Sequence, residues 1–82
     1  MASILVAEDE QLTRWNVAQT LRLESYEVDE APDGETAIEL IRNKSFDAVI
    51  SDYLMPGRFT GLDVLKEFRQ THPDSLIVLL TG

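Results

Sequence analysis

The chain has 82 residues, of which 44% are hydrophobic and 27% charged, and its fifteen acids and seven bases give a net charge of −8. This composition predicts one small globular domain and excludes a disordered chain. The negative charge argues against direct binding of nucleic acid or of an anionic membrane surface. The lack of cysteine excludes disulfides and thiolate metal sites. Since the first residues lack a signal-peptide pattern and no run approaches the roughly 20 apolar residues of a membrane span, we expect a cytoplasmic protein.

Four short hydrophobic runs, at residues 4–7, 26–28, 46–51 and 76–80, have the length of β-strands. The segments between them have helical periodicity. In the first of these segments we expect a broad apolar stripe that packs on a sheet. Its predicted members are Leu12, Trp15 and Ala18, with Val17 and Leu21 beside them.

Capping signals mark the starts of the second and third helices. The second is expected to begin near Asp33, whose carboxylate can accept bonds from free backbone N–H groups. The third is expected to begin where Thr60 and Asp63 have the spacing of a capping box. The apolar positions at helical intervals are Ala37, Leu40 and Ile41 in the second helix, and Leu62, Leu65 and Phe68 in the third.

The strands read as continuous apolar runs separated by helices. Such strands are buried on both faces and must run parallel, which predicts an α/β fold with an open, doubly wound parallel sheet. No repeat, low-complexity tract or linker divides the chain. In sheets of this kind, ligands bind at the carboxyl ends of the strands.

Acidic residues follow two of the predicted strands at that edge. Glu8 and Asp9 follow the first strand, and Asp52 ends the third. If these strands are neighbours, three carboxylates meet, and their repulsion is tolerated when protons or a cation lie among them. Oxygen ligands favour a hard divalent ion, Mg²⁺ most readily. The alternative is that each acid is a solvated residue at the start of a helix, with no ion bound. We prefer this alternative for Glu10. For Asp9 and Asp52 together, we prefer the metal site.

Three motifs carry a resemblance to a known family. "ILVAEDE", "DAVISDYLMPG" and "LIVLLTG", with "APDGETAIELI" between the first two, occur in this order along the whole chain. Together they resemble the receiver domain of bacterial two-component response regulators, whose sheet is flavodoxin-like with strand order 2-1-3-4-5. Trp15 and the aliphatic stretch after it are similar to receivers attached to enhancer-binding transcription activators.

The resemblance implies that Asp52 accepts a phosphoryl group from a phosphohistidine on a sensor histidine kinase or phosphotransfer protein. It further implies that Asp9 and Asp52 bind Mg²⁺ directly, that the backbone carbonyl of Leu54 adds an oxygen, and that Glu8 acts through water. Thr81 matches the hydroxyl residue that acts as the family's switch. Without the other motifs, we would interpret it as a threonine at the end of a strand, favoured there by its β propensity. Members of the family catalyse their own phosphorylation and dephosphorylation, so a conventional enzyme is not expected.

The chain departs from the family pattern in three places. Glu8 stands where aspartate is frequent, and the loop between Gly57 and Gly61 has one residue more than the commonest spacing. The resemblance ends after the fourth strand, so residues 1–82 are expected to be a partial receiver domain, without the fifth strand, the last two helices and the family lysine. Neither Lys44 nor Lys66 stands at the position of that lysine.

These departures lead to two expectations. Without the lysine, phosphorylation is expected to be slower or poorly coupled to a switch. With strand order 2-1-3-4, the fourth strand is expected to be an exposed apolar edge that pairs with another copy. A non-catalytic binding or self-assembly module that uses this edge is therefore the alternative function. A flavin-binding domain is disfavoured because "EDE" after the first strand would repel the phosphate of the flavin. A haloacid-type phosphatase is disfavoured because it needs Asp-x-Asp after its first strand, and "EDE" does not supply the first aspartate.

Overall fold

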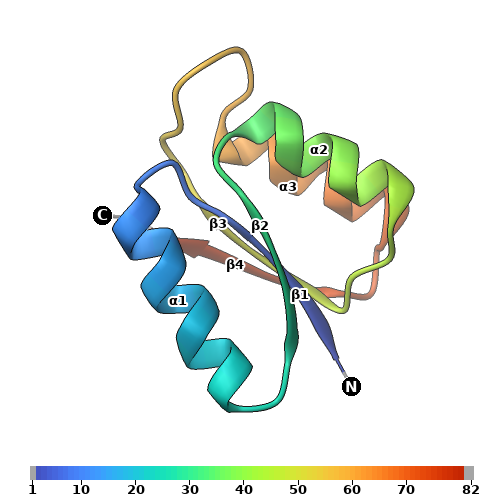
Figure 1. The fold of residues 1–82 in the computed structure, drawn as a ribbon. Helices are drawn as coiled ribbons and strands as arrows, with labels where there is room; N and C mark the ends of the chain where they lie inside the picture. The colour runs from blue at the N-terminus through green and yellow to red at the C-terminus, as the bar shows by residue number, and fades with distance from the viewer. Residues whose placement is uncertain (1, 81–82) are drawn as a thin grey trace.

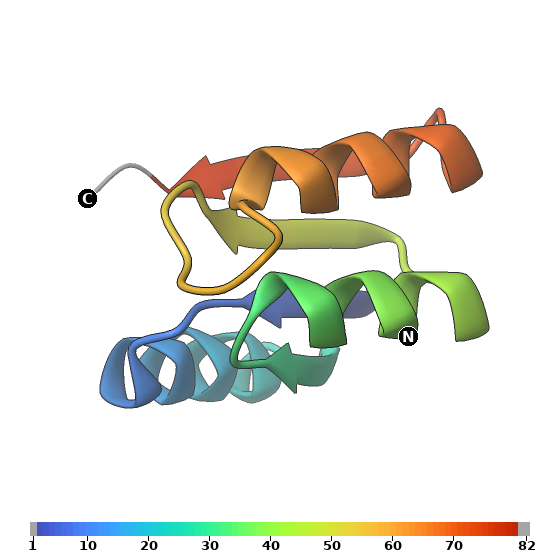
Figure 2. The same cartoon turned by 90° about the horizontal axis from the view of Figure 1, so that it is seen from above.

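Four strands alternate with three helices along residues 2–80, the part of the chain that the computed structural model describes. The strands are β1 (Ser3–Ala7), β2 (Glu27–Ala31), β3 (Ala48–Asp52) and β4 (Leu76–Leu80). The helices are α1 (Gln11–Leu23), α2 (Gly34–Asn43) and α3 (Gly61–Thr71). All strand pairs are parallel, in the order β2-β1-β3-β4 (Figure 2). The predicted doubly wound, flavodoxin-like sheet with order 2-1-3-4 is confirmed.

The helices cover both faces of the sheet, with α1 on one side and α2 and α3 on the other (Figure 1). The alternation of side chains along β1 shows how: Leu5 and Ala7 pack toward α2 and α3, whereas Ile4 and Val6 pack toward α1. All four are buried. The central strands therefore read as continuous apolar runs because both of their faces are covered.

The predicted bounds of the second strand were wrong. The strand expected at residues 26–28 is β2, which runs from Glu27 to Ala31. It is an edge strand, and two of its acids are paired with bases: Asp29 with Lys44, and Glu30 with Arg14 and Arg22. Charged side chains are common on edge strands. Because a search for apolar runs does not count charged residues, it misses part of such a strand.

The predicted stripe of α1 was also partly wrong. Leu12 and Trp15 are 65% and 52% exposed, whereas Ala18 is fully buried. Val17 and Leu21 pack on the sheet beside Ala18, and the side chain of Arg14 is only 15% exposed. At 3.6 residues per turn, Arg14, Val17, Ala18 and Leu21 share one face and Leu12 lies on the opposite one. The arginine was overlooked because a search for apolar periodicity does not count a charged residue, whereas its buried guanidinium has partners in Glu30 and the Glu8 carbonyl.

The caps of α2 and α3 are confirmed. Asp33 accepts a hydrogen bond from the backbone N–H of Thr36 at 2.7 Å, and this bond lowers the pKa of the Asp33 carboxyl. Thr60 and Asp63 form the reciprocal capping box. The buried residues differ slightly from the predicted stripes. The buried apolar side chains are Ala37, Ile38 and Ile41 in α2, with Leu40 partly buried, and Val64 and Phe68 in α3, with Leu65 partly buried and Leu62 exposed.

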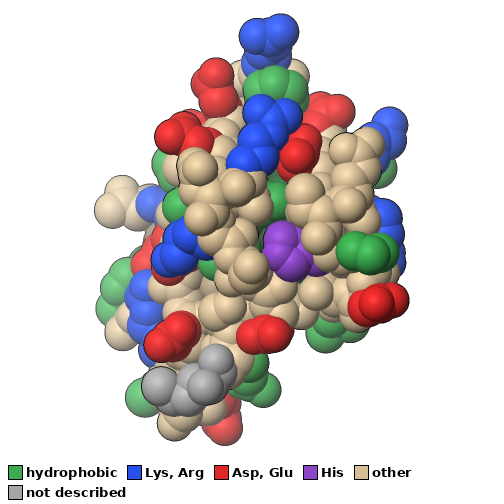
Figure 3. Space-filling model, turned by 90° about the vertical axis from the view of Figure 1, so that its right-hand side faces the viewer, with side chains coloured by type: hydrophobic (Ala, Val, Ile, Leu, Met, Phe, Trp, Pro, Cys, Tyr) green, Lys and Arg blue, Asp and Glu red, His purple; other side chains and the backbone are tan. Residues whose placement is uncertain are grey.

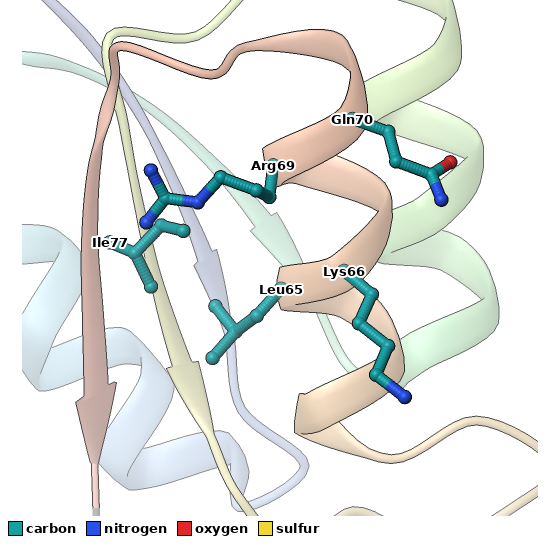
Figure 4. Close-up of a pocket in the computed structure, with 5 residues that line it drawn as sticks. All are labelled: Leu65, Lys66, Arg69, Gln70 and Ile77. Atoms are coloured by element: carbon teal, nitrogen blue, oxygen red, sulfur yellow. The ribbon is translucent and has the colours of Figure 1, made fainter.

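β4 lies at the edge of the described sheet, as predicted, and its outer side is open. Leu76, Val78 and Leu79 are exposed. An open groove separates β4 from α3, with Leu65 and Ile77 pointing toward each other inside it and Arg69 reaching across Ile77 (Figure 4). This groove lies away from the acidic residues at the strand ends.

Charged side chains of both signs are interspersed on the face drawn in Figure 3, where Lys and Arg form no continuous basic patch. Among the ion pairs of the fold is Arg42 with Glu67, which links α2 to α3. Within residues 2–80, no helix is both long and apolar enough to cross a membrane.

Candidate functional site

Three carboxylates meet at the carboxyl ends of β1 and β3. The two strands are neighbours, with Ala7 paired to Ser51, so the residues that follow Ala7 lie beside Asp52. One carboxylate oxygen from each of Glu8, Asp9 and Asp52 lies within 4.8 Å of the others. The sequence thus placed these three acids together correctly, while their individual roles stay predictions.

Glu8 is the buried member of the cluster, with 5% exposure. Its backbone N–H donates to Ala31 at 3.0 Å, which continues the pairing of β1 with β2, and its carboxylate accepts the N–H of Glu10 at 3.0 Å. Burial raises the pKa of the Glu8 carboxyl; the bond from Glu10 lowers it in part, and the charges of Asp52 and Asp9 raise it further. A cation among the three carboxylates relieves this unfavourable charge. The donor set consists of oxygen alone, so it fits a hard divalent ion.

The cluster opens on one side. Asp9 is exposed and Asp52 is half-buried. Next to Asp9 lies a hollow of about 370 Å³ between the loops that follow the strands. Its other lining residues are Pro32, Asp33, Glu35, Pro56, Gly57 and Arg58. A partner or a small phosphate compound can therefore reach Asp9 from solvent, and the half-buried Asp52 is partly accessible.

Glu10 has a different place from its two neighbours. It is the N-cap residue of α1, it is exposed, and its side chain makes no capping hydrogen bond. It is also outside the cluster of three carboxylates. The interpretation of Glu10 as a helix-start residue agrees with this position.

The loop from β3 to α3 ends close to the backbone of Asp52. Gly57 has φ +96°, a conformation that favours glycine. A Cβ on Gly61 would lie 1.9 Å from the backbone oxygen of Asp52, and one on Gly34 would lie 2.6 Å from the backbone oxygen of Phe59. The loop with its additional residue therefore passes over the start of α2 and returns against Asp52.

Leu54 and Thr81 are the other two predicted site residues. Leu54 is 71% exposed in this loop, and the role of its carbonyl stays a prediction. Thr81 lies outside the described residues. Lys44 pairs with Asp29, and Lys66 lines the groove between α3 and β4. As predicted, neither lysine belongs to the acidic site.

Sequence reasoning missed Arg14, whose Nη1 donates to the backbone carbonyl of Glu8 at 2.9 Å. It also missed the close contact between Gly61 and the Asp52 backbone. Arg14 stands three residues before Val17, on the buried face of α1, and this position could have indicated that its side chain is buried. No local signal in the sequence identifies the contact between Gly61 and the Asp52 backbone.

With this geometry in place, comparison with known proteins decides the family. The family model described as "Response regulator receiver domain" matches residues 4–82. The chain belongs to this receiver domain family.

Relatives and solved structures agree with this assignment. Response regulator MprA of Mycobacterium sp. (strain KMS) is 40% identical over 79 residues, which cover 96% of this receiver and 34% of MprA. Sensor kinase CckA of Brucella abortus is 35% identical over 83 residues, which cover 99% of this receiver and 9% of that kinase. The crystal structure of TrrA from Thermotoga maritima in complex with Mg²⁺-BeF matches with TM-score 0.90 and 41% identity, over 99% of this receiver and 70% of that chain. The receiver thus spans about a third of the length of MprA.

Proposed function

We propose that this receiver is a phosphoacceptor module of two-component signalling, which takes a phosphoryl group from a phosphohistidine onto Asp52 with Mg²⁺ in the acidic site. The donor is a sensor histidine kinase or a phosphotransfer protein. The observation that carries the proposal is the meeting of Glu8, Asp9 and Asp52 within 4.8 Å at the carboxyl ends of two adjacent strands. Membership of the receiver family and the likeness to TrrA, a protein solved with Mg²⁺-BeF, support it.

In the transfer, a carboxylate oxygen of Asp52 forms a bond to phosphorus, and the bond between phosphorus and the donor histidine nitrogen breaks. The nitrogen keeps the electron pair of that bond. Asp52 is the last residue of β3 and is half-buried, and the strand pairing and the start of α3 fix its backbone. This fixed position favours in-line attack, since phosphoryl transfer depends chiefly on positioning and charge stabilisation.

The residues that would hold Mg²⁺ are Asp9 and Asp52 directly, Glu8 through water, and the backbone carbonyl of Leu54. When bound, the ion supplies positive charge that offsets the charge on the phosphoryl oxygens. Thr81 is proposed as the switch hydroxyl that hydrogen-bonds the transferred group.

The test is phosphorylation by a small donor. Incubation with Mg²⁺ and an acyl or amido phosphate, followed by intact mass measurement, is expected to add one phosphoryl group. The adduct is expected to disappear in Asp52→Asn and after removal of Mg²⁺ by a chelator, whereas Asp74→Asn, a change at an exposed acid in the loop before β4, keeps it. A folded wild-type chain that stays unmodified at every donor concentration would contradict the proposal, as would an adduct that persists in Asp52→Asn.

The position of β4 at the edge of the described sheet supports a second candidate, a non-catalytic self-assembly module. Within residues 2–80, no strand pairs with the outer edge of β4, and its Leu76, Val78 and Leu79 are exposed. We propose a second copy of the chain as the occupant, paired edge to edge through β4.

Sedimentation at low micromolar concentration tests the self-association of this candidate. Self-assembly predicts a dimer that becomes a monomer in Val78→Lys, because a lysine on the edge disfavours strand pairing. Leu62→Lys, an equally exposed apolar position on α3, is the control and is expected to leave the dimer intact. A wild-type chain that sediments only as a monomer would exclude the second candidate.

A further inference from the structure

Arg14 connects the acidic site to α1 and β2. Its Nη1 donates to the backbone carbonyl of Glu8 at 2.9 Å, and its Nε lies 3.4 Å from Oε1 of Glu30. The side chain is only 15% exposed, and its buried Nε makes no hydrogen bond within the described residues. The guanidinium is therefore held between two fixed groups, the end of β1 and the edge strand.

We propose that Arg14 is a positioning residue for the two acids at the end of β1, an inference that rests on the proposed role of those acids in binding Mg²⁺. The carbonyl of Glu8 belongs to the peptide unit that joins Glu8 to Asp9. A charged donor on this carbonyl fixes the plane of that peptide unit. The plane determines the directions in which the two side chains leave the backbone, so Arg14 sets how their carboxylates face Asp52.

The pairing pattern explains why a side chain is needed at this point. The N–H of Glu8 is held by Ala31 of β2, but β1 ends at Ala7 and α1 begins at Gln11, so the intervening residues lie outside both elements. The Glu8 side chain accepts the N–H of Glu10, and Arg14 binds the Glu8 carbonyl. These contacts together order a loop that carries two of the three carboxylates.

Arg22 provides a matched control on the same helix. It also pairs with Glu30, at 3.1 Å, and it also donates to a backbone carbonyl, that of Val28 at 3.0 Å. Val28 is the second residue of β2, at the opposite end of the strand from the acidic site. Arg14→Met and Arg22→Met thus remove the same kinds of interaction, but only the first removes a contact to the loop that carries the acids.

The first test measures Mg²⁺ affinity by titration calorimetry. Arg14→Met is expected to weaken Mg²⁺ binding by about tenfold, as is usual when a group that orients metal ligands is lost. Arg22→Met is expected to retain wild-type affinity. Arg14→Lys is expected to be intermediate, because one ammonium group can reach the Glu8 carbonyl but cannot also reproduce the planar contact to Glu30. Equal affinity in Arg14→Met and the wild type, or an equal loss in both methionine variants, would overturn the proposal.

A second measurement separates this proposal from the proposed function. Backbone ¹⁵N relaxation of the metal-free receiver gives order parameters for the amides of Asp9 and Glu10. These are expected to fall in Arg14→Met and to stay unchanged in Arg22→Met. If the wild type binds no Mg²⁺ and accepts no phosphoryl group, the proposed function fails, and the order parameters still decide the role of Arg14. Unchanged order in Arg14→Met would refute that role whatever the outcome with Mg²⁺.

Discussion

Replacing Gly61 with alanine is expected to destabilise the receiver more than any other exchange of glycine for alanine within the described residues. The added Cβ would lie 1.9 Å from the backbone oxygen of Asp52, 2.8 Å from its carbonyl carbon and 2.9 Å from Cα of Tyr53. All three atoms belong to the backbone at the end of β3, so no flexible side chain can move away. Either α3 or the end of β3 must shift, at a cost of about 3 kcal/mol in the free energy of unfolding.

Urea unfolding of Gly61→Ala and of the control Gly57→Ala measures this effect. Gly57 has φ +96°, but a Cβ there would meet no atom within 4 Å, so only backbone strain of about 1 kcal/mol is expected. Since two of the three displaced atoms belong to Asp52 itself, the folded fraction of Gly61→Ala is also expected to be phosphorylated more slowly. Equal stability of the two variants would show that β3 and α3 are not held together as described.

Replacing Asp9 with asparagine is expected to change the metal-free and the Mg²⁺-bound receiver in opposite directions. In the absence of metal, one of three mutually repelling carboxylates is neutralised, so the thermal midpoint rises. In the presence of Mg²⁺, the ligand that we propose Asp9 to be is lost, and affinity is expected to fall by about a hundredfold, at the upper end of the loss seen when orienting groups are removed. The stabilisation by Mg²⁺ therefore disappears at concentrations that stabilise the wild type.

Thermal unfolding with and without Mg²⁺ measures both effects, and Glu10→Gln is the control. Glu10 is an adjacent exposed acid outside the cluster, so its neutralisation is expected to leave the response to Mg²⁺ unchanged. An Asp9→Asn variant that is destabilised under both conditions would indicate a structural role for Asp9. Equal responses of the two variants would indicate that the ion binds through diffuse charge instead of a defined site.

Much of the fold could be predicted because the decisive signals are local. The continuous apolar runs of β1 and β3 follow from burial on both faces, and the starts of α2 and α3 follow from the capping chemistry of Asp33 and of Thr60 with Asp63. The meeting of the three acids followed from one further rule, that parallel neighbours end at the same edge of the sheet.

The features that could not be predicted depend on contacts between distant residues. The face of α1 was misjudged because Arg14 is charged and its partners, Glu30 and the Glu8 carbonyl, lie in other elements. The predicted bounds of β2 were too short because its acids are paired with bases of other elements. The contact of Gly61 with Asp52 arises only when α3 lies against the end of β3. Apolar periodicity along the chain contains none of this information.

Mapping the phosphoryl group tests the central claim most directly. The receiver is treated with Mg²⁺ and a small phosphate donor, the acyl phosphate is reduced with borohydride, and the modified residue is located by peptide mass spectrometry. The account predicts modification of Asp52 alone, at the end of β3 beside Glu8 and Asp9. Modification of Asp9 or Glu8 in place of Asp52, or of acids scattered over the surface, would contradict it.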